Sequence, residues 1–257
     1  MTKGMQRNRN HLRNRGEPNL MPHSRIIPKM TTLLVGSLLL GSGCGHSFLP
    51  ASITEGVIEY KMTFPDLDPN GLMSGMLPEK SELSFADGQQ SMDLSAGMGI
   101  FRTSMVINTP AQEVDYHMSI MGKSLFAKYG PRDLEAIDST PEPISVLYTN
   151  SMDTIAGYPC KKAYLVYENM DQPEAEVWYT DAITMSTPNW YTPYKEIPGV
   201  LMRYEVMQHH IRIRMEASSV KPGPVDKAKF QLRPGHEEVS PAVLDHELEE
   251  VLGTFNQ

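Results

Sequence analysis

The sequence of 257 residues predicts a mainly β protein, an antiparallel sheet followed by a single C-terminal helix. From residue 58 onward, apolar and polar side chains alternate in many short segments, and this period of two is typical of strands with one buried face. The 20 prolines and 19 glycines supply turns between such segments. Only residues 241–252 change to a helical period. Strands that follow one another through short turns pair antiparallel by default.

The first half of the expected sheet runs from residue 58 to residue 129. In residues 58–64 every second side chain is apolar, and the side chains between them are Glu, Lys and Thr. Asp87 and Gly88 are typical of a tight hairpin turn, because both tolerate positive φ. Residues 131–143 show little periodicity, so we interpret them as an acidic connector. We expect strands at residues 58–64, 83–85, 92–94, 101–107, 114–120 and 124–129.

The stretch Asp153–Asp181 is the most informative part of the second half. Residues 157–159 have turn chemistry, residues 163–167 form an apolar strand pattern, and residues 177–180 can return as the partner strand. We interpret this stretch as a hairpin with a long loop, at the centre of the sheet. Further strands are expected at residues 144–148, 197–207, 211–217 and 230–232, about ten strands in all.

The C-terminal segment has the pattern of an amphipathic helix. Ser240 followed by Pro241 fits an N-cap and a first helical position, and Gly253 can end the helix. Between them, apolar residues recur at helical spacing on an otherwise acidic segment. We therefore expect the helix at residues 241–252 to dock on the sheet, and residues 54–257 to form one β-rich domain.

The charge of the chain is distributed unevenly. The whole sequence has 23 Lys and Arg against 31 Asp and Glu, a net charge of -8. Residues 1–43 contain seven of the basic residues and one acid, Glu17, which leaves 16 basic and 30 acidic residues and a net charge of -14 after residue 43. This balance argues against nucleic acid as a partner, because phosphates require a basic surface. It also argues against broad electrostatic adhesion to anionic lipid.

Residues 1–43 resemble a lipoprotein signal peptide. They combine a basic segment with a short apolar core within residues 31–43, which is shorter than the roughly 20 residues that span a bilayer. Small residues directly before Cys44 resemble the lipoprotein box of bacteria, although Leu40 lies one position earlier than in the usual pattern. The resemblance implies that Cys44 becomes a lipidated N-terminus, with residues 44–53 as a tether. The alternative is an ordinary signal peptide with an incidental cysteine.

The residues around the two cysteines suggest where the protein lies and how its thiols behave. Residues 45–47 lack an acidic side chain that would retain a lipoprotein in the inner membrane, so we expect a lipid anchor in the outer membrane, facing the periplasm. Lipidation leaves Cys160 as the other thiol. Lys161 and Lys162 could lower its pKa, but we prefer to interpret Cys160 as a small buried residue at the start of a strand.

Five segments together resemble a family of uncharacterised domains in Gram-negative lipoproteins. They are GVIEY at residues 56–60, IAGYPCKKAY at 155–164, EVWYT at 176–180, IPGV at 197–200 and FQLRPGHEEV at 230–239. The likeness covers residues 54–240, and His236 stands where an aromatic residue is more common. That family is similar to the lipoprotein carrier and receptor LolA and LolB. The resemblance implies a strongly curved antiparallel sheet, an open half-barrel, with helices on its concave side and room for acyl chains between them.

Two classes of function fit these observations. The first is a membrane-anchored, non-enzymatic lipoprotein that binds a hydrophobic ligand, an acyl chain or a lipid, in a cavity between sheet and helix. Methionine side chains adapt to such ligands, and exposed aromatic side chains suit ligand or partner contacts. The candidate contacts are Met62, Met202, Met215, Trp190 and Tyr191, with core filling as the alternative. The second class is a structural or accessory lipoprotein of an envelope complex, with a filled core and no ligand.

No motif in the sequence predicts catalysis. It contains no Gly-x-Ser-x-Gly elbow, no phosphate-binding loop and no His-Glu-x-x-His motif, and we find no supported pairing of a nucleophile with a base. We therefore expect no enzyme, no metal site and no cofactor. The expected partners are the membrane through the N-terminal lipid, a hydrophobic ligand, and an envelope protein.

Overall fold

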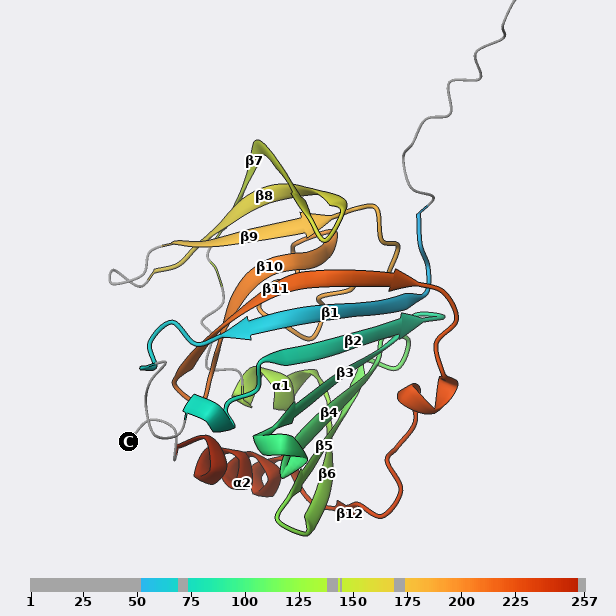
Figure 1. The fold of residues 1–257 in the computed structure, drawn as a ribbon, viewed down its shortest axis with the longest axis vertical. Coiled ribbons are helices and arrows are strands. Elements are labelled where there is room, and N and C mark those ends of the chain that lie inside the picture. The colour runs from blue at the N-terminus through green and yellow to red at the C-terminus, as the bar shows by residue number, and fades with distance from the viewer. Residues whose placement is uncertain (1–51, 69–73, 138–142, 144, 169–173, 254–257) are drawn as a thin grey trace, which may run out of the picture. The chain divides into compact units, whose positions relative to one another are not determined.

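A computed structural model describes residues 52–68, 74–137, 143, 145–168 and 174–253. In this part of the chain, twelve strands form one open, curved sheet (Figure 1). The predicted fold class, a mainly β curved antiparallel sheet with a C-terminal helix, is confirmed. The strands are β1 Gly56–Thr63, β2 Lys80–Ala86, β3 Gln89–Ala96, β4 Phe101–Asn108, β5 Glu113–Ile120, β6 Lys123–Tyr129, β7 Ser145–Ile155, β8 Tyr158–Val166, β9 Glu174–Thr180, β10 Val200–Gln208, β11 Ile211–Pro222 and β12 Glu237–Glu238.

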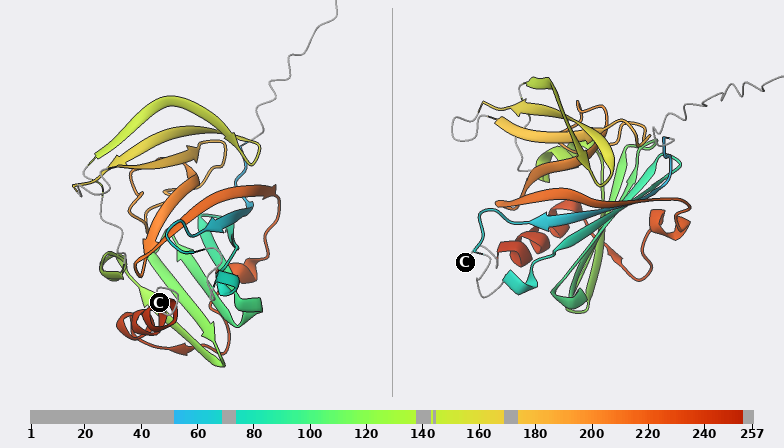
Figure 2. Two further views of the ribbon diagram at one scale, coloured as in Figure 1. Left: turned by 60° about the vertical axis from the view of Figure 1, so that its left-hand side comes forward. Right: turned by 45° about the horizontal axis from the view of Figure 1, so that its top comes forward.

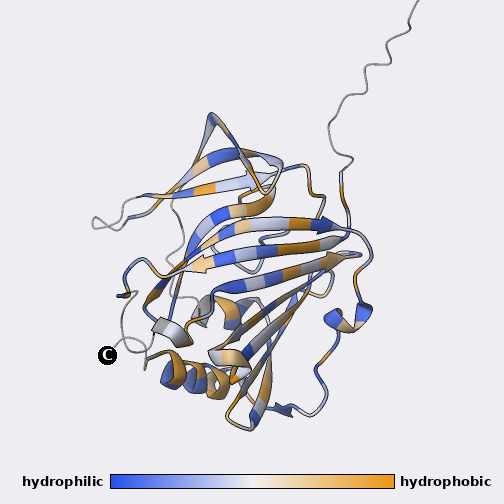
Figure 3. Ribbon diagram, in the orientation of Figure 1, coloured by the Kyte–Doolittle hydropathy of each residue, from blue (hydrophilic) through white to orange (hydrophobic). Residues whose placement is uncertain are grey.

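The sheet consists of two antiparallel meanders joined through β1 and β11. Its order is β12-β6-β5-β4-β3-β2-β1-β11-β10-β9-β8-β7, and only the short β12–β6 pair is parallel. The register shifts within the β1–β11, β9–β10 and β7–β8 pairs. Such bulges bend a strand and increase its twist, and Figure 2 shows the resulting curvature from two further directions. The alternation that predicts these strands appears in Figure 3 as stripes along β1 and β11.

The predicted position of the hairpin at Asp153–Asp181 is wrong. The structure places β7, β8 and β9 at one end of the sheet, with β7 as the edge strand. The centre lies instead at β1 and its neighbours, because β11 returns to pair with β1 across most of the sequence. The turn also differs: it consists of Ala156 and Gly157, both with positive φ (51° and 84°), and the strand begins directly afterwards. Two consecutive residues of positive φ match the twist of a hairpin.

Two other local predictions are wrong. The connector expected at residues 131–143 begins with a helix, α1 (Pro131–Ile137), whose first turn is held by Asp133 Oδ2 accepting the Gly130 N–H at 3.0 Å. The strand expected at residues 230–232 is absent from the described residues there. A short 3-10 helix, Lys227–Phe230, takes its place, because the Asp226 side chain accepts the Ala228 N–H and caps it. Two apolar residues at a spacing of two are too weak a strand signal to compete with a capped turn.

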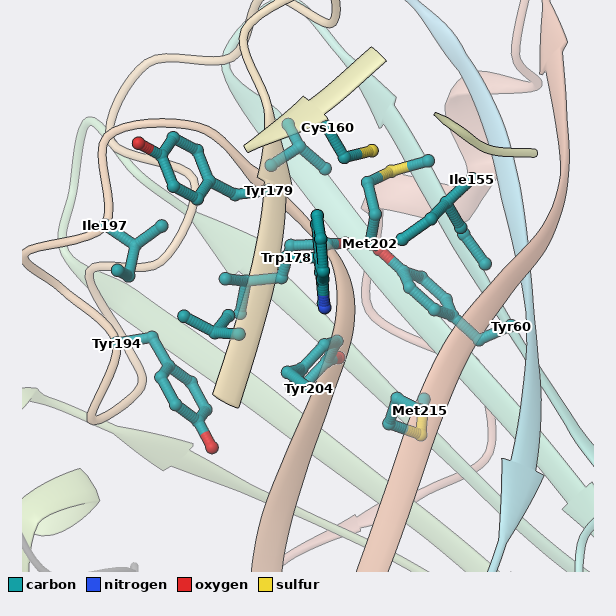
Figure 4. Close-up of a cluster of buried hydrophobic side chains, with 14 of the residues drawn as sticks. Tyr60, Ile155, Cys160, Trp178, Tyr179, Tyr194, Ile197, Met202, Tyr204 and Met215 are labelled. Carbon is teal, nitrogen blue, oxygen red and sulfur yellow. Dashed lines mark hydrogen bonds between the residues drawn. The ribbon is translucent and has the colours of Figure 1, made fainter. Parts of the chain in front are cut away.

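The C-terminal helix α2 (Pro241–Gly253) is confirmed. Ser240 Oγ accepts the Val243 N–H at 3.4 Å, as an N-cap does. Leu244 and Leu248 are fully buried and form a small cluster with residues of β4, β5 and β6. The helix therefore covers one half of the apolar face of the sheet, which we call the inner face. A second and larger cluster lies between β1, β2 and β8–β11 and includes Trp178 (Figure 4).

Candidate functional site

The inner face, where an acyl chain is expected to bind, is occupied by protein. Residues 182–199, which connect β9 to β10, cross to the opposite half of the sheet. There the Gln90 side chain donates a hydrogen bond to Pro188 O at 3.2 Å, and Trp190 Nε1 donates to Thr109 Oγ1 at 3.1 Å. Asn189 anchors the segment by donating to Ile197 O and to Gly199 O, both at 2.9 Å. This segment and α2 together cover the inner face of β4–β6.

The five predicted contact residues lie in two separate places. Met62, Met202 and Met215 are buried in the larger cluster, and Met62 and Met215 face each other across β1 and β11. Trp190 and Tyr191 are half-buried and pack against the smaller cluster under α2. All five therefore contribute to the packed interior, which is the alternative that the sequence left open. Their contact with a ligand or a partner stays a prediction.

An apolar pocket lies between the sheet and the C-terminal end of α2. Its free volume is about 40 Å³, far below the roughly 300–1,000 Å³ of small-molecule pockets. Of the five predicted contact residues, only Met62 lines it. A cavity of this size accepts part of one apolar side chain and does not enclose an acyl chain. Its lining includes Phe64, Leu77, Phe101, Tyr116, Ile211 and Leu252.

A larger groove, about 560 Å³, lies on the outer face and is lined mainly by charged and polar residues. It runs beneath residues 227–239, which we call the strap because they cross the outer face from β3 to the edge of β6. Asp93 on β3 holds the strap by accepting from Lys229 Nζ at 2.6 Å and from Arg233 Nη2 at 3.0 Å. Burial raises the pKa of Asp93, but hydrogen bonds from Lys229 and Ser104 outweigh it and hold the pKa below its usual value. These ion pairs hold the strap against the outer face, and we call Asp93, Lys229, Arg233 and the residues packed around them the clasp.

His117 on β5 is the buried centre of this clasp. Its side chain is stacked on Phe126, with ring centroids 5.4 Å apart, and meets the edge of His236 at 5.3 Å. Nε2 accepts the backbone N–H of Arg233 at 3.1 Å, so the proton lies on Nδ1, which faces Ser104 O at 3.3 Å. These residues were not predicted from the sequence, because nothing local marks His117 as the partner of a segment more than a hundred residues later.

We expect the protein to lose stability as the pH falls below about 6.5, the ordinary pKa of histidine. Burial lowers the pKa of His117, and the nearby His236 and Arg233 add to this effect, while Ser104 O and Asp115 oppose it. The unfolded state therefore binds the proton first, and stability declines from the unfolded pKa down to the folded one. The measurement is the free energy of unfolding in urea between about pH 7.5 and about pH 5.5.

The variant His117→Gln should show a shallower decline over that range, because the titrating group is removed. His246→Gln is the matched control, since His246 is exposed on α2. Equal slopes for His117→Gln and the parent protein would contradict the assignment.

Cys160 is buried at the start of β8, as preferred from the sequence. Burial raises the pKa of its thiol to about 11, and Sγ donates to Tyr158 O at 3.3 Å. Lys161 and Lys162 do not activate the thiol, because Lys161 pairs with Asp181 and Lys162 with Glu176. A thiol that stays protonated is a poor nucleophile.

The described residues contain no group of three or more His, Cys, Asp or Glu side chains placed to hold a metal ion. Within the same ranges, no helix is long and apolar enough to cross a membrane.

In comparisons with known proteins, the chain is similar only to proteins among the solved structures. No protein-family model matches the chain, and no curated protein matches it. Among solved structures, it is similar to PNGF-II (TM-score 0.44, 14% identity, 76% of this chain and 32% of that one). It is also similar to MucB in complex with periplasmic MucA (0.31, 8%, 72% and 56%), and to a putative outer membrane lipoprotein-sorting protein domain from Vibrio parahaemolyticus (0.20, 9%, 69% and 89%). The chain thus spans about a third of the first structure and just over half of the second, and at these TM-scores we derive neither family nor activity from the likeness.

Proposed function

We propose that this chain is a non-enzymatic lipoprotein of the bacterial cell envelope whose domain binds another envelope protein. The observation that carries the proposal is the occupied inner face. Residues 182–199 and α2 lie where a carrier would hold an acyl chain, and the apolar pocket between sheet and helix measures about 40 Å³. A sheet whose interior is filled and whose apolar side chains also reach the surface fits an interaction domain better than a carrier.

The lipid anchor at Cys44 is part of the proposal and rests on the leader and the small residues before it. Cys44 lies outside the described residues. The domain itself begins no later than Ile53, although residues 44–53 are predicted from the sequence as a tether. Ile53 bridges to Ile183, and its carbonyl accepts the Thr184 N–H at 2.8 Å. Residues 44–51 then remain as the link between the lipid and the sheet.

The anchor is tested by producing the full chain in a Gram-negative host that is fed an alkyne analogue of palmitate. The parent protein should take up the label and sediment with membranes, and Cys44→Ala should lose both properties. Cys160→Ala is the matched control and should keep the label, because its thiol is buried. A parent protein that is exported but never labelled would contradict the proposal that the chain is a lipoprotein.

The binding of a hydrophobic ligand is the second candidate. The apolar lining of the pocket beside α2 favours it, but α2 would have to move to enlarge that pocket. Native mass spectrometry of the domain purified without its leader separates the two candidates. Co-purifying lipid in a fixed ratio would favour the carrier, whereas a ligand-free domain that does not bind a fluorescent fatty acid is the outcome we expect.

A further inference from the structure

Four exposed apolar side chains gather at one end of the sheet. They are Met76, Met98, Ile100 and Met121, whose exposed fractions are 38%, 103%, 47% and 83%. They belong to the connections β1–β2, β3–β4 and β5–β6, and these three connections lie at the same end because alternate hairpins of a meander turn at the same edge. We call these four residues the methionine rim.

The methionine rim is continuous. A Cβ atom at Gly97 would lie 3.9 Å from Met76 Cε, so the β1–β2 connection meets the β3–β4 turn. Phe101 and Ile120 are cross-strand partners, which places Ile100 and Met121 side by side just beyond them. An exposed apolar patch that joins three connections is uncommon on a protein surface that contacts only water.

Two of the rim residues also occupy unfavourable backbone conformations. Met98 has a φ of 56° and Met121 a φ of 46°, in the left-handed region that favours Gly, Asn and Asp. A small polar residue would suit either turn better and would not expose a long apolar side chain. Methionine therefore makes both turns locally less stable than a small polar residue would. Backbone strain of this kind is concentrated at functional sites. Methionine is also common on surfaces that bind apolar segments of partners.

The apolar pocket beside α2 lies directly behind the rim. Leu77 and Phe101, which line it, are the chain neighbours of Met76 and Ile100. Interfaces are dominated by a few side chains that fill pockets of this kind. A volume of about 40 Å³ accepts the end of one apolar side chain from a partner.

A cation flanks the patch. The Arg102 guanidinium packs over the β3–β4 turn, where its Nη2 lies 3.0 Å from the Cβ position of Gly99. Arg102 also lines the polar groove of the outer face, where the other cations, Lys80, Lys229 and Arg233, are all paired with carboxylates. No ion pair of Arg102 is found within the described ranges, and the side chain is exposed. A carboxylate on the partner is its natural complement.

The charge of the protein argues against an anionic membrane as the occupant. After residue 43 the chain carries a net charge of -14, which disfavours electrostatic adhesion to anionic lipid. A second copy of the chain is disfavoured as well, because a symmetric contact through the rim would place both Arg102 side chains in the same interface.

We infer that the methionine rim and the pocket behind it dock a segment of a partner protein that carries an apolar side chain beside a carboxylate. The apolar side chain enters the pocket, the methionines surround it, and the carboxylate pairs with Arg102. This inference rests on the proposed function and names the surface that performs it.

The test is photo-crosslinking of the full chain in native membranes, with benzoylphenylalanine placed singly at position 98, 121 or 152. Position 152 is the control, because Met152 is as exposed as the rim but lies on the edge strand β7. We expect one protein to be captured from positions 98 and 121 and not from 152, with the crosslink on a segment that contains an apolar residue beside Asp or Glu. Arg102→Glu should reduce this capture about tenfold, and Arg102→Lys should largely retain it.

The possible outcomes distinguish a failure of the docking surface from a failure of the proposed function. Capture from position 152 alone would overturn the docking surface and leave the proposed function in place. Capture from no position would overturn both. Crosslinks to lipid or to a second copy of the chain, or capture that Arg102→Glu does not reduce, would overturn the inference. Thermal unfolding of each variant confirms that it is folded, since all of the substituted positions are exposed.

Discussion

Replacing Trp178 with alanine is expected to lower the free energy of unfolding by about 3–5 kcal/mol, the range for large aromatic residues removed from a core. Trp178 on β9 is buried in the larger cluster, which also contains Met202 and Cys160 (Figure 4). Lys162 Nζ lies 5.1 Å and Arg203 Cζ 5.8 Å from the centre of its ring. The substitution therefore opens a cavity and also removes the surface on which two cations rest.

Urea unfolding monitored by circular dichroism measures this loss. Trp190 is the other of the two tryptophans, so its fluorescence reports on the smaller cluster in the same experiment. Trp178→Phe should cost less, because most of the buried volume remains. Leu147→Ala is the surface control, since Leu147 is exposed on β7, and should change stability by less than about 0.5 kcal/mol. A loss below about 1 kcal/mol for Trp178→Ala would show that the cluster is not packed as described.

Replacing Leu244 with alanine is expected to cost about 2–5 kcal/mol and to release α2 from the sheet. Leu244 is fully buried and, together with Leu248, forms the part of α2 that is buried against the sheet. A helix of this length has little stability of its own in water, so its docking depends on these contacts. The neighbouring residue Val243 is exposed, and Val243→Ala provides the matched control.

Hydrogen exchange of the α2 amides, measured alongside urea unfolding, reports this release directly. We expect faster exchange throughout α2 in Leu244→Ala and little change in Val243→Ala. The same variant bears on function: its uncovered inner face would bind a fluorescent fatty acid if α2 gates a lipid cavity. We expect no saturable binding, because residues 182–199 still occupy the face. Unchanged exchange in Leu244→Ala would contradict the docking of α2.

The surface residues of the proposed docking site were not predicted from the sequence. Met98 and Met121 each stand next to glycine in a turn, and that context was the available signal, since a methionine in a turn has no core to fill. Met62, Met202 and Met215, which were singled out instead, lie on strands, where alternation already explains an apolar residue. Arg102 is one of several arginines in the sequence, and only its position over Gly99 distinguishes it.

The sequence by itself determined those local elements whose signal is strong within a few consecutive residues. Alternation along β1 and β11 and the cap at Ser240 are properties of a few consecutive residues, so they appear in the sequence with little ambiguity. For the same reason the mainly β class and the C-terminal helix were predicted correctly.

Only the tertiary structure decided which strands are neighbours, and therefore where a site can form. The pairing of Gly56 with Pro222, the strap held by Asp93, and the segment 182–199 across the inner face all join residues that are far apart in the chain. Alternation shows which face of a strand is buried, but many strand orders satisfy the same pattern. The choice among them depends on the packing and hydrogen bonds of the whole sheet, which no short stretch of sequence contains.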